Sequence, residues 1–292
     1  MKSATRILAA LLCVLLLLPT VVFAEAQPSL EKQIAQSAEG MSALGGKKGE
    51  LLKDRELFPA GDSVCDWLAI AMALSGTRES YSDYLAELKA HVEDAYAKNG
   101  CLDRNKATEY HRISLTVLAL GGNPTNFGTK PDGSAIDLIA EGTYNYARDP
   151  GAQGLNGWIW ALLTLDAGDT EVPADALYSR EDMVNAISVA QEPDGGFGLI
   201  PGKSDVDITA MAVQALAPYR DQMETEIDAA LSYLSGQLTD TCGYIAYGDE
   251  NAESTAQVIL ALCALGIDPE TDSCFVKGEH TCLLYTSPSP RD

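Results

Sequence analysis

The stretch AMAVQAL at residues 210–216 decides the fold, because similar small-apolar segments recur along the chain. The other copies are AIAMAL at 69–74, SLTVLAL at 114–120, IWALLTL at 159–165 and AQVILALCAL at 256–265. Their final leucines are separated by 46, 45, 51 and 49 residues; they are Leu74, Leu120, Leu165, Leu216 and Leu265. A period of this size is typical of an array of supersecondary units.

Each unit is expected to be a pair of helices. The recurring segments are apolar or small at nearly every position, which is typical of a helix buried on all sides. Segments between them, such as REDMVNAISVA at 180–190 and EIDAALSYL at 226–234, carry the apolar stripe of a surface helix. Alternating β-branched runs are rare, so the fold class is all-α. A cyclic array of such pairs is an α/α toroid with inner and outer helix rings, and an open array is a solenoid.

A glycine-rich turn joins the outer helix near residue 190 to the next inner helix. It reads QEPDGGFG at 191–198, with a looser copy, QLTDTCGY, at 237–244. Gly195 and Gly196 permit left-handed backbone angles, and the Asp194 side chain can hydrogen-bond within the turn.

This turn resembles the repeat of the prenyltransferase and squalene–hopene cyclase superfamily, including exported bacterial proteins described as prenyltransferase-like. The segments 106–112, 122–126, 154–157 and 204–210 are also similar to that group, and the resemblance covers roughly residues 30–280. It implies an α/α toroid of six helix pairs. The DITAMAVQAL rhythm of residues 207–216 is also similar to the helical domain of transcobalamin-type corrinoid carriers.

The two ends of the chain differ from its middle. Residues 1–24 have a basic start, a short apolar run and small residues before a cleavage position, which predicts a signal peptide and a secreted or cell-surface protein without a transmembrane span after cleavage. Residues 281–292 resemble a translated sequencing adapter. The toroid domain is therefore expected over 25–280, without its last helix pair.

The formal net charge of −22 limits the partners. Phosphate backbones would be repelled, so nucleic acid is excluded as a partner, and anionic membrane surfaces are disfavoured on the same ground.

The segment DVDITA at 205–210 is the strongest candidate for chemistry. Squalene–hopene-type cyclases have Asp-x-Asp-Asp-Thr-Ala here, and the resemblance places Asp207 on the aspartate that protonates the substrate. Ile208 departs from that pattern, because it replaces the neighbouring carboxylate. The alternative is structural: Ser204 caps the inner helix and Asp207 completes a capping box. We therefore assign no catalytic residue, and Asp207 would be catalytic only in a cyclase.

A ligand site is predicted at the starts of the inner helices. Asn156 lies between two glycines at a helix start, with two tryptophans following on the same helix, and acidic side chains open the next two inner helices. The predicted ligand-binding residues are Asn156, Trp158, Trp160, Asp205, Asp207 and Glu253. Alternatively, these tryptophans are packing residues of the core. No metal site and no cofactor are predicted. Asp240, Cys242 and His280 resemble the zinc ligands of protein prenyltransferases, but Asp240 and Cys242 lie in a turn and His280 adjoins the 281–292 segment.

Three functions remain open from the sequence. The first is an exported, non-catalytic toroid that binds a small hydrophobic or amphipathic ligand, for which a corrinoid is one candidate, or a partner protein. The second is a terpene or polyprene cyclase or a prenyltransferase-type enzyme. The third is a structural or adhesion module of the cell surface.

Overall fold

The computed structural model describes residues 36–37, 39–40, 43, 49–246 and 248–283. The predicted signal peptide lies outside this range, as does most of the 281–292 segment. Within it the chain is mostly helical, with short strand pairs, which confirms the all-α class.

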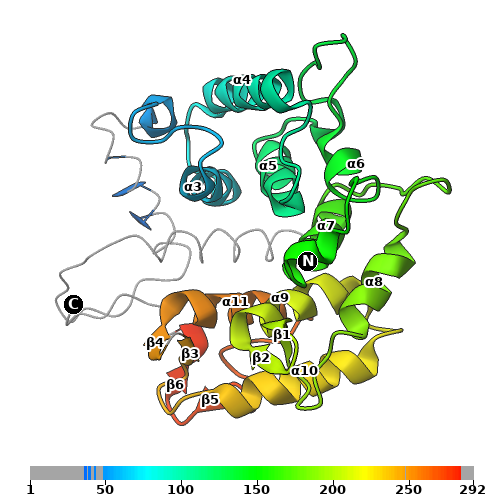
Figure 1. Ribbon diagram of the computed structural model, residues 1–292. Coiled ribbons are helices and arrows are strands. Elements are labelled where there is room, and N and C mark those ends of the chain that lie inside the picture. Colours follow the sequence, from blue (N-terminus) through cyan, green and yellow to red (C-terminus); the bar gives the residue numbers. More distant parts are fainter. Residues whose placement is uncertain (1–35, 38, 41–42, 44–48, 247, 284–292) are drawn as a thin grey trace.

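All five recurring segments form helices, as predicted. These inner helices are α3 (Ser63–Leu74), α5 (Ala107–Ala119), α7 (Asn156–Ala167), α9 (Val206–Leu216) and α11 (Ala252–Ala264). Each contacts the next, so they form one curved row through the molecule (Figure 1). Residues near the starts of neighbouring inner helices lie against one another, such as Asp66 with Arg112 and Asp207 with Ser254, so these helices run parallel.

A second set of helices alternates with the inner ones. They are α4 (Tyr81–Asn99), α6 (Leu138–Gly142), α8 (Arg180–Ser188) and α10 (Glu224–Gln237). The two predicted surface helices are thereby confirmed as α8 and α10. Figure 1 shows α4, α8 and α10 on the outer side of the inner row. One-turn 3-10 helices complete the helical structure: Leu51–Lys53, Pro124–Asn126, Pro150–Gln153 and Ala217–Tyr219.

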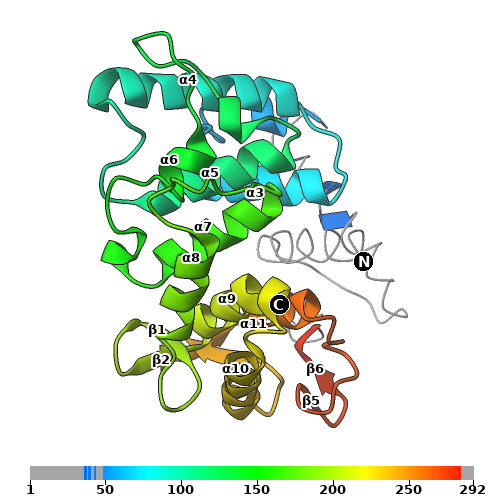
Figure 2. The same ribbon diagram turned by 90° about the vertical axis from the view of Figure 1, so that its right-hand side faces the viewer.

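Three small antiparallel hairpins lie in the C-terminal half (Figure 2). They are β1 (Phe197–Ile200) with β2 (Lys203–Asp205), β3 (Tyr244–Ala246) with β4 (Asp249–Asn251), and β5 (Val276–Lys277) with β6 (His280–Thr281). The first two lead directly into α9 and α11. The sequence analysis missed them because each strand has at most four residues, too few to show a period of two.

A buried threonine hydroxyl joins each of these two hairpins to the helix that follows through hydrogen bonds. The Phe197 N–H donates to Thr209 Oγ1 at 2.8 Å, and the Thr209 hydroxyl donates to the Asp205 carbonyl at 2.6 Å. Thr255 repeats the arrangement one unit later, accepting from the Tyr244 N–H at 3.2 Å. The same threonine hydrogen bond therefore occurs in two successive repeat units.

The same helices have side-chain caps at their first turn. Asp205 Oδ1 accepts from the Ile208 N–H at 3.0 Å, and Asn251 Oδ1 accepts from the Ser254 N–H at 2.8 Å. Asp205 thus has the capping role that the sequence assigned to Ser204. Ser204 instead donates to Asp194 Oδ1 at 2.6 Å, because the hairpin brings it back over the glycine-rich turn.

Two clusters of buried apolar side chains make up the core. One extends from the 3-10 helix at 51–53 to Tyr146 and includes α3, α4 and α5, and the other extends from Ile139 to Cys282 and includes α7 to α11. The two clusters interleave in residues 136–146, so α6 and the loop after it join the two halves of the row.

Replacing Thr209 by valine should destabilise the protein by about 1–3 kcal/mol, because the buried Phe197 N–H would lose its acceptor while the side-chain volume is kept. Urea unfolding measures this. Thr225, which is exposed on α10, provides the control: Thr225→Val should change the free energy of unfolding by less than about 0.5 kcal/mol. Equal effects of the two substitutions would contradict this role of the Thr209 hydroxyl.

Candidate functional site

The starts of α9 and α11 lie side by side and bring acidic groups together. Asp207 is half-buried in the first turn of α9, and its Oδ1 atom is enclosed without a hydrogen-bond partner. Ser254 of α11 lies close enough to lower the pKa of Asp207, but the Ser254 hydroxyl makes no hydrogen bond of standard geometry. The predicted site residues Asp205, Asp207 and Glu253 are therefore neighbours in space as well as in the repeat.

Burial raises the pKa of the Asp207 carboxyl. Ser254 acts in the opposite direction, and the negative charges of Asp205 and Glu253 raise the pKa further. Burial and like charges both disfavour the ionised form. Asp207 is thus unlike an ordinary helix-capping aspartate, whose ionised form the helix start would stabilise.

Ile208 cannot supply a second carboxylate, and its position shows what it does instead. It is 4% exposed and belongs to the larger core cluster. The residue that follows Asp207 is therefore directed into the core between helices.

The two tryptophans of α7 point to different parts of the molecule. Trp160 lies against Trp67 of α3, with ring centroids 5.3 Å apart. Trp158 lies against Tyr178 in an edge-to-face contact at 5.1 Å and covers Gly151, where a Cβ atom would collide with its ring. The structure therefore separates Trp158 from Trp160, which the sequence analysis had placed in one site.

Trp67 is the residue that the sequence analysis left out of the site. The helix α5 lies between α3 and α7, and its outer side is covered by α4 and α6. The Trp67–Trp160 contact therefore reaches across α5, and we place it on the inner, concave side of the row. Each tryptophan lies at the fifth residue of its helix, a correspondence that becomes informative once the helices are known to run parallel.

Asn156 shares the face of Trp160, because residues four apart in a helix lie one above the other. Its Oδ1 atom is buried without a partner. Along α9 and α11, Gln214 donates from Nε2 to Gln257 Oε1 at 3.1 Å. Partly exposed polar side chains of α7, α9 and α11 thus accompany the tryptophan pair of α3 and α7.

A buried ion pair joins α3 to α5 near the N-terminal ends of these two helices. Arg112 Nε donates to Asp66 Oδ2 at 3.0 Å, and Asp66 also accepts from the Tyr84 hydroxyl and from the Gly61 N–H. Asp66 is fully buried, and both of its oxygens have donors. This network has no free group for chemistry and serves to hold the two helices together.

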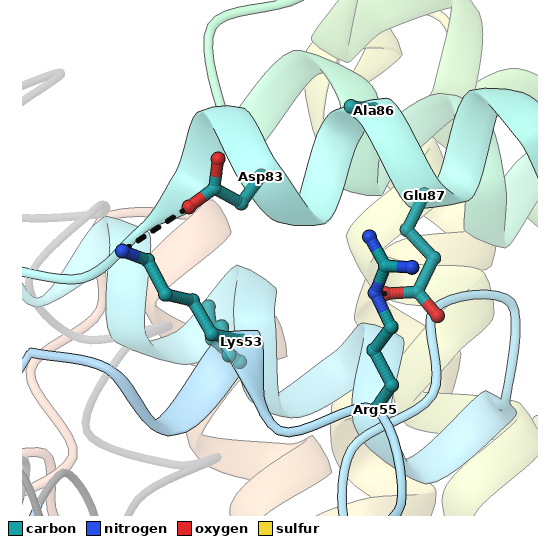
Figure 3. A pocket seen from close by; sticks show the side chains of 6 residues that line it. Lys53, Arg55, Asp83, Ala86 and Glu87 are labelled. Atoms are coloured by element: carbon teal, nitrogen blue, oxygen red, sulfur yellow. Dashed lines mark ion pairs between the residues drawn. The ribbon is translucent and has the colours of Figure 1, made fainter.

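The pocket in Figure 3 lies between the 51–53 helix and α4 and has a volume of about 240 Å³. Two ion pairs cross it: Lys53 with Asp83 at 3.4 Å and Arg55 with Glu87 at 3.2 Å. Because the charged groups of this pocket are paired with one another, none of them is left to bind a ligand. We infer that the two ion pairs hold the 51–55 segment against α4.

His111 is the only described histidine that is buried. Its Nε2 atom lies 2.6 Å from the Gly142 carbonyl oxygen, and its Nδ1 atom has no partner. Burial lowers its pKa to about 4, so the ring is neutral at physiological pH. Gly142 allows this close approach of α6, because a Cβ atom there would collide with Tyr110.

Within the residues that the structure describes, no group of three or more His, Cys, Asp or Glu side chains could hold a metal ion. The Cys242 thiol donates to the His280 carbonyl at 3.0 Å, while the His280 side chain is exposed.

None of the described helices is both long and apolar enough to cross a membrane. Neither the protein-family models nor the curated proteins give a match to this chain.

Replacing Asp207 by asparagine should leave the melting temperature unchanged or raise it at pH 7. A carboxyl whose pKa is raised by folding contributes stability when it is protonated and loses that contribution as the pH rises through its folded pKa. The gain should therefore disappear near pH 4 and below. Exposed Asp221→Asn is the control, and a lower melting temperature for Asp207→Asn at pH 7 would indicate that the helix start favours the ionised form.

Removing His111 should flatten the dependence of stability on pH. Folding lowers the pKa of His111 from 6.5 to about 4, so the unfolded chain binds a proton that the native chain does not, and stability falls as the pH drops below 6.5. Between pH 6.5 and 5 this loss is about 2 kcal/mol. Urea unfolding at both pH values should show a smaller loss for His111→Gln, whereas exposed His91→Gln should keep the wild-type slope. Identical slopes for both variants would be inconsistent with a neutral, buried His111.

Proposed function

We propose that this protein is an exported or cell-surface α/α toroid that binds a small amphipathic ligand on the concave face of its inner helices and does not catalyse a reaction. The curved row of parallel inner helices, alternating with outer helices, supports this arrangement.

The observation that carries the proposal is the contact between Trp67 and Trp160. Both side chains are only half-buried; Trp160 packs against the larger core cluster, whereas Trp67 belongs to neither cluster of described residues. A tryptophan used only for packing would be expected inside a cluster. A half-exposed aromatic pair on a concave surface instead offers a flat apolar contact to a ligand.

The polar half of the concave face supports an amphipathic ligand. Asn156 Oδ1 and Asp207 Oδ1 are enclosed and unpartnered, and each costs free energy until a donor reaches it. A ligand with an apolar ring system and peripheral amide or hydroxyl donors would satisfy both parts. A corrinoid has this chemistry and is our first candidate.

A cyclase is the second candidate, because Asp207 has a raised pKa and lies where the resemblance places the catalytic acid. The direction of Ile208 into the core opposes it, since no second carboxylate assists the acid. Turnover of squalene by the intact protein, detected by mass spectrometry and lost in Asp207→Asn, would favour the cyclase over the binding protein.

Titration calorimetry with cobalamin and with lauric acid tests the binding function. We expect saturable binding of at least one ligand, accompanied by a change in tryptophan fluorescence. Trp160→Phe should lower the affinity by about threefold to tenfold, as expected for the loss of an aromatic contact of about 1 kcal/mol.

Trp158→Phe is the matched control, since Trp158 is on the same helix but faces Tyr178. It should leave the affinity unchanged. Failure of cobalamin alone would remove the corrinoid version, and failure of both ligands would favour the structural or adhesion module.

A further inference from the structure

A second cavity lies away from the concave face, where α4 ends and α5 begins. Its volume is about 450 Å³, within the range of sites for small molecules. Two loops, residues 100–106 and 143–149, form its sides, and Tyr110 of α5 and Glu141 of α6 also line it. It shares no lining residue with the predicted site.

Two arginines from the two loops line this cavity. Arg104 donates to the Asn99 carbonyl at 2.8 Å, and Arg148 donates to Asn105 Oδ1 at 2.8 Å. These contacts hold each side chain in place and use one nitrogen of each guanidinium. In the part of the chain that the structure describes, neither arginine has a carboxylate partner, although acidic residues outnumber basic ones by 42 to 20.

The carboxylates of the cavity are already engaged. Glu141 accepts from Lys130 at 2.9 Å through Oε1 and from the Tyr96 hydroxyl at 2.9 Å through Oε2. Asp103 Oδ1 accepts from the N–H groups of Asn105 and Lys106. Each of these carboxylates thus has at least one oxygen held by donors of the protein, while the two arginines keep spare N–H groups.

Tyr146 adds a further donor. It is 4% exposed, its hydroxyl has no partner, and its ring meets Tyr110 edge-to-face at 6.0 Å. Burial and the negative charge of Asp103 raise the pKa of Tyr146 to about 12, so the hydroxyl keeps its proton at physiological pH. Because the hydroxyl is enclosed, a bound acceptor would reach it only after a small shift of the 143–149 loop.

We propose that this cavity binds a small organic anion, a carboxylate or phosphate attached to a flat ring. The guanidinium groups of Arg104 and Arg148 hold the acidic group from two sides, and the fork geometry of arginine suits both anions. The ring lies against the Tyr110 and Tyr146 pair, and the acidic group accepts the Tyr146 hydroxyl. This site is independent of the concave face, and Trp160→Phe should leave it unchanged.

Titration calorimetry with phenyl phosphate and benzoate tests the proposal, and benzyl alcohol serves as the uncharged match. We expect at least one anion to bind saturably and benzyl alcohol to bind at least tenfold more weakly. Arg104→Gln with Arg148→Gln should lower the affinity tenfold or more, and because both side chains are exposed, the fold should be kept. Arg220→Gln, an exposed arginine elsewhere, should leave the affinity unchanged.

Tyr146→Phe provides a second, sharper variant. Because the hydroxyl has no partner in the protein, its removal should not lower the stability of the free protein, but it should lower the affinity threefold to tenfold. An unchanged affinity would remove Tyr146 from the site. Absence of binding by both anions at millimolar concentration, equal binding of benzyl alcohol, or an equal loss in Arg220→Gln would overturn the proposal.

Discussion

The parallel packing of the inner helices is the constraint on which the rest of the structure depends. Parallel helices bring their N-terminal ends to the same end of the row, and each end leaves backbone N–H groups without helical partners. Asp62, Asp205 and Asn251 supply side-chain acceptors for three of these ends. Short polar and acidic residues are therefore concentrated at one end of an otherwise apolar row.

That concentration also produces the candidate site. Capping needs one acceptor for each helix, and Asp205 meets that need for α9. Asp207 lies beyond the cap, is half-buried against α11 and has an oxygen without a partner. The pKa of Asp207 is raised because its carboxylate is buried beside Asp205, which already accepts the hydrogen bond that caps α9. A residue that the fold does not need at this place is a reasonable candidate for ligand binding.

The two proposed binding regions differ in their physical basis. The concave face pairs half-buried tryptophans with amide and carboxylate oxygens, so it suits a ligand with an apolar body and donors at its edge. The cavity between the 100–106 and 143–149 loops has two arginines without acidic partners among the described residues, so it suits an anion.

The sequence by itself determined the five inner helices and the two outer helices α8 and α10, because burial on all sides and the surface stripe are local patterns that repeat with the unit. It also indicated that Asp205, Asp207 and Glu253 would occupy equivalent helix starts. Only the tertiary structure decided that Trp160 meets Trp67 while Trp158 turns to Tyr178, and that Arg104 and Arg148 share a cavity. These contacts join residues 20 to 93 positions apart, and they depend on the rotation and register of packed helices and loops, which no local pattern specifies.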